Sequence, residues 1–277
     1  KTLVRFQVGP PTSARLSRSR IMNTYKRIIV KIGTKVLSKE DKTFDEEFLK
    51  SLVKQVVELR KKDIQVVLVT SGAVGAGKSI LSLQDIKSEV VQKQIFAAVG
   101  QVKLMNIYSE LFGRYDYHCA QVLVTKEDFR DENHYLNMQN CFEGLLLDGV
   151  IPIVNENDVV ATIELMFTDN DELAGLITKQ LKSDSLIILS SVDGILDNTG
   201  DTVSEVNSSN IDVVAGYINP DKSTGGRGGM TSKFRAAKEL SEKGIPVFIV
   251  NGKRKDVLLD ILKGQKTGTH FIVQTLA

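Results

Sequence analysis

The chain has 277 residues, of which 42% are hydrophobic and 25% are charged, and its formal net charge is +2. No apolar run reaches the roughly 18–20 residues that a membrane-spanning helix needs, so we expect no membrane partner. Residues 1–27 contain seven Lys or Arg and no acid, and removing them leaves 29 basic residues against 34 acidic ones, a net charge of −5. A mildly acidic chain lacks the basic surface that nucleic-acid binding requires, so we expect no nucleic-acid partner either.

Residues 1–25 are predicted to be a basic extension outside a single folded domain that spans residues 26–277. Two origins stay open for this extension. It is either vector-derived or upstream sequence, since Met22 could start a native chain, or an organelle transit peptide that is rich in Arg and Ser. The two cysteines, Cys119 and Cys141, lack metal-ligand spacing, so we expect small core residues in a reducing compartment and a cytoplasmic protein.

Short apolar segments alternate along the chain with amphipathic segments of helical length. The predicted strands are 27–32, 65–70, 119–124, 150–154, 185–190 and 246–250, and the predicted helices are 45–62, 90–115, 131–148, 172–181, 231–243 and 255–262. Runs such as QVVLVT and LIILS are apolar on both faces, which is typical of parallel strands covered by helices. We therefore predict the α/β class, as a three-layer α/β/α sandwich around a mainly parallel sheet, with residues 193–210 as a hairpin or small insertion.

Polar motifs follow several of these strands, where the carboxyl ends of a parallel sheet collect ligands. The first strand ends in VKIGTK, so Lys31 and the free backbone amides around Gly33 are expected to face phosphate oxygens. The glycine-rich stretch GGRGGMTSK precedes a predicted helix and ends at Lys233. Glycines at this position present backbone amides to phosphate, and the helix dipole adds partial positive charge.

The stretch GAVGAGKS at residues 72–79 matches the P-loop pattern letter for letter, with Lys78 on the outer phosphates and Ser79 on magnesium. Against a P-loop, no second strand ends in an obvious magnesium-binding acid, and the other motifs would be left without a role. A glycine-rich turn that binds no ligand is a further alternative.

Two acidic turns complete the set of motifs. NEND at residues 155–158 offers amide and carboxylate groups that suit the ammonium and carboxylate of an amino acid, although Asx-rich turns also occur without any ligand. DND at residues 169–171 opens a helix, and Asp171 is expected either to cap that helix or to hold the two lysines.

In this order and spacing, VKIGTKVL, VLVTSGAVGAGK, VNENDVV, TDNDELAG and TGGRGGMTSK resemble the amino acid kinase family, and most closely its members that phosphorylate glutamate. The resemblance covers roughly residues 26–273. It implies catalytic roles for Lys31, Lys233 and Asp171. It implies that the acceptor is bound by Ser71, Gly72, Asn155, Asp158 and Asn170. It implies that the nucleotide is bound by Lys31, Gly33, Ser190, Ser191, Arg227, Gly228, Gly229, Met230, Thr231, Ser232 and Lys233.

The resemblance also implies a reaction. ATP, with Mg²⁺, would phosphorylate the γ-carboxylate of L-glutamate to L-glutamyl 5-phosphate in the first step of proline synthesis, with proline as feedback inhibitor and a homodimer or homotetramer as the assembly. A C-terminal RNA-binding-like PUA domain, frequent in the family, is not expected. The family often has an Asp where this chain has Ser191, which puts one nucleotide contact in doubt. The alternatives are acetylglutamate or carbamate kinase, a P-loop NTPase, and a non-catalytic proline or nucleotide sensor.

Overall fold

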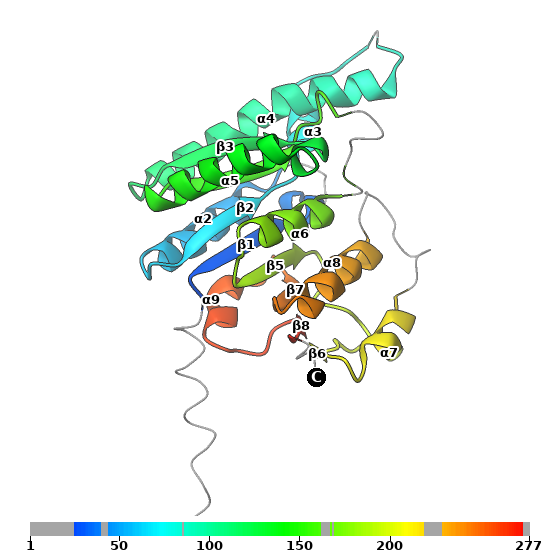
Figure 1. Ribbon diagram of the computed structural model, residues 1–277. Helices are drawn as coiled ribbons and strands as arrows, with labels where there is room; N and C mark the ends of the chain where they lie inside the picture. The colour runs from blue at the N-terminus through cyan, green and yellow to red at the C-terminus, as the bar shows by residue number, and fades with distance from the viewer. Residues whose placement is uncertain are drawn as a thin grey trace, which may run out of the picture.

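The computed structural model describes residues 25–39, 44–84, 86–161, 167, 169–218 and 229–273. Its centre is an eight-stranded sheet with the strand order β3-β4-β2-β1-β5-β7-β8-β6 (Figure 1). The strands are β1 (Arg27–Ile32), β2 (Gln65–Val69), β3 (Cys119–Val124), β4 (Ile151–Glu156), β5 (Ser185–Ser190), β6 (Glu205–Val206), β7 (Val247–Asn251) and β8 (Thr269–Phe271). Among the described residues, the pairing of β7 with β8 is the only antiparallel one in this sheet, so the predicted mainly parallel sheet is confirmed.

Helices cover both faces of the sheet. They are α2 (Glu46–Arg60), α3 (Ala73–Lys78), α4 (Glu89–Gly113), α5 (Glu132–Leu147), α6 (Asn170–Gln180), α7 (Ile211–Gly216), α8 (Met230–Glu242) and α9 (Val257–Leu262), with 3₁₀ turns at Thr34–Leu37 and Glu127–Phe129. One hydrophobic core joins the sheet to α2, α4 and α9, and a second core joins its other face to α5, α6, α7 and α8 (Figure 1). The predicted three-layer sandwich is therefore confirmed.

Local sequence sets where several helices begin. The side chain of Asp45 accepts a hydrogen bond from the backbone N–H of Phe48 at 3.1 Å, and Asp131 accepts one from His134 at 2.8 Å. A short acidic side chain at this position satisfies a backbone donor that the first turn leaves unpaired. These caps explain why two amphipathic segments start as helices within one residue of their predicted positions.

Several features differ from the sequence predictions. The glycine-rich stretch after β2 forms the short helix α3 instead of an irregular turn. Residues 193–210 contain the expected hairpin, with an antiparallel bridge between Leu196 and Thr202, but they also add strand β6 to the sheet. Cys119 is partly buried and Cys141 is exposed, so the prediction of two core thiols is wrong for Cys141. Its position on the outer side of α5 leaves it in solvent.

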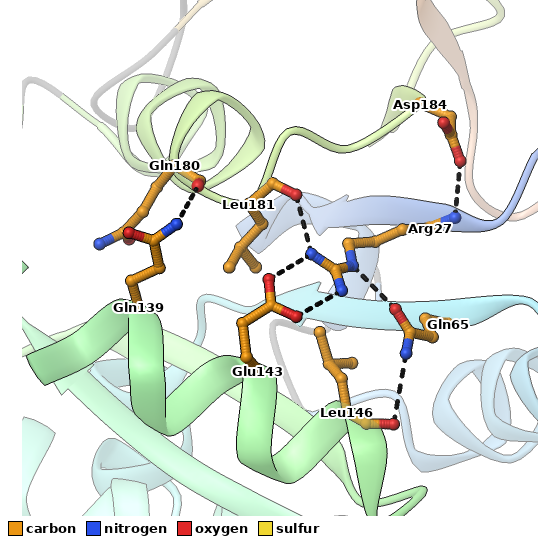
Figure 2. Close-up of polar contacts among 8 residues, drawn as sticks. All are labelled: Arg27, Gln65, Gln139, Glu143, Leu146, Gln180, Leu181 and Asp184. Carbon is orange, nitrogen blue, oxygen red and sulfur yellow. Dashed lines mark hydrogen bonds and ion pairs between the residues drawn. The ribbon is translucent and has the colours of Figure 1, made fainter. Parts of the chain in front are cut away.

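A polar network holds the amino end of β1 in place (Figure 2). The guanidinium group of Arg27 donates to both carboxylate oxygens of Glu143 on α5, at 2.7 Å each, and to the side chain of Gln65 at 2.8 Å. It also donates to the carbonyl of Leu181, and the Asp184 carboxylate accepts the backbone N–H of Arg27. The hydrogen bonds from Arg27 hold the pKa of Glu143 below its ordinary value. The network therefore links β1 to β2, α5 and the segment between α6 and β5.

Candidate active site

Three charged side chains from distant parts of the sequence meet beyond the carboxyl end of β1. Asp171, in the first turn of α6, lies with Oδ1 2.5 Å from the Nζ of Lys31 and with Oδ2 2.9 Å from the Nζ of Lys233 on α8. Asp171 is fully buried, and both lysines are nearly so. The structure thus brings together the three residues for which the sequence predicts catalytic roles.

The sheet and the helix cap determine this meeting point. Lys31 lies opposite Val69 of β2 and Ile188 of β5, in the centre of the sheet. Asp169 is the N-cap of α6, because its Oδ1 accepts the backbone N–H groups of Asp171 and Glu172 at 2.7 and 3.1 Å. The alternative in which Asp171 itself caps the helix is therefore wrong, and its carboxylate is directed to the lysines.

The electrostatics of this cluster favour an anionic ligand. Burial lowers the pKa of Lys31, the attraction of Asp171 opposes that shift, and the neighbouring Lys233 adds to it. One carboxylate lies between the two ammonium groups, so these three side chains carry a net charge of +1, and the nearby buried carboxylate of Asp169 also acts on Lys31. The two adjacent ammonium groups would be stabilised further by the negative oxygens of a phosphate group.

Side-chain amides and hydroxyls lie beside the cluster, on the side of β2 and β4. The Nδ2 atom of Asn170 donates to the carbonyl of Thr70 at 2.6 Å, to the Oγ of Ser71 at 2.9 Å and to the Oδ1 of Asn155 at 3.1 Å. Among the predicted acceptor-binding residues, Asn170 therefore contacts both Ser71 and Asn155. Asp158 lies on the turn after β4, where it forms an ion pair with Lys93 of α4 at 2.7 Å.

The glycines of the P-loop-like stretch serve helix packing. Gly72, at φ +95°, adopts the left-handed conformation that starts α3. A Cβ on Gly77 would lie 1.9 Å from the carbonyl oxygen of Phe96, and a Cβ on Gly100 would lie 1.8 Å from that of Ala73, so α3 and α4 touch through their backbones. Lys78 is exposed and lies over the Phe96 ring, 5.7 Å from its centre. Because these residues form a helix instead of a loop around phosphate, the P-loop alternative is wrong.

The predicted nucleotide-binding residues fall into three groups. Gly33 differs from expectation, because its amide donates to the carbonyl of Leu189 at 3.1 Å and is not free for phosphate. Gly229 is the N-cap of α8, followed by Met230, Thr231, Ser232 and Lys233 in its first turns, while Arg227 and Gly228 lie outside the described residues. Ser190 is buried and Ser191 exposed at the end of β5, next to a polar cavity of about 290 Å³ whose lining includes Asp193, Asn251 and Arg254.

Sequence reasoning missed three residues of this region. Asp169 was part of a recognised motif, and its spacing to the start of α6 would have identified it as the cap. Lys93 and Gln101 lie within the long helix α4 and belong to no motif, so no local signal marks them. Gln101 is buried and accepts a hydrogen bond from Asn155 at 3.0 Å.

Comparison with known proteins agrees with this geometry. A model of the amino acid kinase family matches residues 26–251. The chain belongs to the amino acid kinase family. Among its relatives, a glutamate 5-kinase of Chlorobaculum tepidum is 48% identical, over 90% of this chain and 70% of that protein. A glutamate 5-kinase of Alkaliphilus metalliredigens is 40% identical, over 91% of this chain and 97% of that protein.

Two solved structures share the fold of this chain. A carbamate kinase of Giardia superimposes with a TM-score of 0.66 at 18% identity, over 90% of this chain and 99% of that one. A UMP kinase of Bacillus anthracis superimposes with a TM-score of 0.59 at 14% identity, over 91% of this chain and 98% of that one. In the described part of the chain, no helix combines the length and apolar character needed to cross a membrane.

Proposed function

We propose that this chain transfers the γ-phosphoryl group of ATP to the γ-carboxylate of L-glutamate, which yields L-glutamyl 5-phosphate and ADP, the first step of proline synthesis. The observation that carries the proposal is the buried cluster of Lys31, Asp171 and Lys233 beside the hydrogen-bonded group of Ser71, Asn155 and Asn170. The first group suits a phosphoryl group, and the second suits an amino acid. The close relatives that carry the name glutamate 5-kinase support the same reaction.

The chemistry requires positioning and charge stabilisation more than proton transfer. A γ-carboxylate oxygen of glutamate attacks the γ-phosphorus, the bond between that phosphorus and the β,γ-bridging oxygen breaks, and ADP leaves with the bonding electrons. No general base is needed, because the attacking carboxylate is already ionised at neutral pH. Lys31 and Lys233 stabilise the negative charge on the transferring group, and Asp171 holds the two ammonium groups at the required spacing.

The residues present fit the cofactors of such a reaction. The phosphates of ATP would lie between Lys31 and the first turn of α8, with the nucleoside toward the polar cavity beside Ser190. The Oδ2 atom of Asp169 is buried and has no hydrogen-bond partner within the described residues. Since Mg²⁺ takes one or two carboxylate oxygens together with phosphate oxygens and water, Asp169 would hold that ion, which neutralises charge on the outer phosphates when bound.

Further parts of the proposal rest on family resemblance alone. They are a single amino acid kinase domain from residue 26 onward, feedback inhibition by proline, and assembly as a homodimer or homotetramer. A cytoplasmic location is proposed in addition, which the free thiols of Cys119 and Cys141 support.

The test is release of ADP with three acceptors, namely L-glutamate, N-acetylglutamate and carbamate, followed by trapping of the acyl phosphate with hydroxylamine. We expect ADP release and hydroxamate formation with L-glutamate only. ADP release with another acceptor but not with glutamate would replace the proposed substrate, and tight ATP binding without turnover on any acceptor would favour a sensor.

A further inference from the structure

A row of side-chain amides spans four secondary-structure elements and ends at the proposed acceptor site. Gln101 on α4 donates through Nε2 to the Oε1 of Gln121 on β3 at 3.4 Å, and its own Oε1 accepts from the Nδ2 of Asn155 on β4 at 3.0 Å. The Oδ1 of Asn155 in turn accepts from the Nδ2 of Asn170 on α6 at 3.1 Å. Gln101 and Asn155 are both buried, so each depends on these partners.

Two backbone groups fix which end of each amide faces which neighbour. The Oδ1 of Asn155 lies 2.9 Å from the backbone N–H of Glu156, which can only donate. The Nδ2 of Asn170 lies 2.6 Å from the carbonyl of Thr70, which can only accept. Asn155 must therefore direct its Nδ2 toward Gln101, and Gln101 must accept this hydrogen bond through its Oε1.

This order leaves Asn170 with one defined role. All of its described side-chain hydrogen bonds use Nδ2, so its Oδ1 remains as an acceptor next to the catalytic cluster. An amide oxygen at that place attracts an ammonium group, whereas the reversed amide would direct N–H groups at it. If Gln101 were lost, the buried Nδ2 of Asn155 would lack its partner, and Asn155 would shift toward another acceptor and weaken its contact with Asn170. The Thr70 carbonyl would still keep the Asn170 amide the same way round, so the expected effect is a displaced Asn170 and not a reversed one.

We propose that Gln101 is a positioning residue that holds Asn155 and, through it, Asn170, so that the Asn170 amide oxygen receives the α-ammonium group of the acceptor amino acid. This inference rests on the proposed function. It assigns specificity for an α-amino acid to a residue of α4 that touches neither substrate. A site built to hydrogen-bond a polar group discriminates strongly against analogues that lack the group.

The test compares glutamate with glutarate, which has both carboxylates but no ammonium group. In Gln101→Met, which keeps the length of the side chain but forms no such hydrogen bonds, we expect the KM for glutamate to rise about tenfold while kcat stays within about twofold. The KM for ATP and the inhibition constant of glutarate should not change. In Gln101→Glu an oxygen still faces Asn155, so the KM for glutamate should stay within about threefold of wild type.

Gln55→Met is the matched control, because Gln55 is equally buried and accepts the backbone N–H of Leu258 far from the site. It should lower the Tm without changing the KM for glutamate.

The inference is overturned if Gln101→Met has a wild-type KM, if glutarate inhibition weakens as much as glutamate binding, or if a folded Gln101→Glu raises the KM tenfold. Should Gln101→Met not fold, the Gln101→Glu result decides alone. A wild-type protein without glutamate-dependent ADP release would instead refute the proposed function, and this inference with it.

Discussion

Replacing Asp171 by Asn tests the proposed role of its carboxylate most directly. The change keeps the size of the side chain but removes the negative charge that lies 2.5 Å from Lys31 and 2.9 Å from Lys233. Removal of one partner from a buried ion pair costs about 3–5 kcal/mol, because the remaining charge stays buried without compensation. Part of that cost falls on Lys31, whose pKa would lie below its wild-type level because the ammonium form loses the carboxylate that stabilises it.

The direction of the pH effect follows from the wild-type site. Burial already lowers the pKa of Lys31, and Asp171 opposes that shift. Activity that needs the ammonium form is present below this pKa and is lost as the pH rises through it. In Asp171→Asn the loss therefore begins at lower pH, and the variant should retain more of its activity in acid than in base.

The assay is kcat/KM for ATP as a function of pH, with ADP quantified directly, since this ratio reports the free enzyme. We expect the basic limb of the profile to move to lower pH by at least about one unit. Glu172→Gln is the matched control, because it removes the same charge one residue along α6, where Glu172 pairs with Lys126, and it should leave the basic limb in place. A folded Asp171→Asn variant with reduced activity but an unshifted basic limb would refute the electrostatic role.

Three other predictions concern parts of the molecule outside this cluster. Lys78→Ala should leave kcat within about tenfold of wild type, because Lys78 is exposed on α3, whereas a loss beyond about a thousandfold would restore the P-loop interpretation. Gly100→Ala should lower the free energy of unfolding, measured in urea, by at least about 1–3 kcal/mol. Gly113→Ala is the control, because no atom lies near its added Cβ, and it should not destabilise the protein. Equal effects of the two substitutions would argue against the close contact of α3 with α4. Glu143→Gln should lower the free energy of unfolding at neutral pH, because the hydrogen bonds from Arg27 favour the ionised carboxylate. The difference in this free energy between variant and wild type should shrink as the pH falls through the lowered pKa of Glu143, and a difference independent of pH would contradict this.

The sequence predicted the sheet well because its strands are short apolar runs with distinct boundaries. The strands β1, β3 and β5 have their predicted bounds, β2 ends one residue early, and β4 and β7 differ by one or two residues at each end. The short strands β6 and β8 escaped prediction, because two or three residues carry no periodic pattern and pair only where the tertiary fold places them. The helix α3 was missed for a different reason. Its glycines are poor helix formers, and it is stabilised by contact with α4.

The site shows the same division between local and long-range information. Lys31, Asp171 and Lys233 could be singled out because each follows or opens a recognisable element, and their convergence followed from parallel topology. The amide row could not be found in this way, because Gln101 and Gln121 gain their significance only when α4 and β3 lie beside β4. The expected free amide at Gly33 was wrong because β5 pairs past the end of β1 and takes that donor.

The hydrogen bonds of Arg27 have a consequence for Lys31. Arg27 and Lys31 are four residues apart on β1, so their side chains leave the strand on the same face, about 13 Å apart along it. A slip of β1 by two residues would preserve which side chains face each core, yet it would carry the lysine ammonium about 7 Å away from its carboxylate. Apolar burial alone cannot tell these two alignments apart. The two hydrogen bonds from Arg27 to Glu143, at the opposite end of the strand, form in only one of the two alignments. They thereby set the position along β1 of the lysine that is proposed to contact the phosphoryl group.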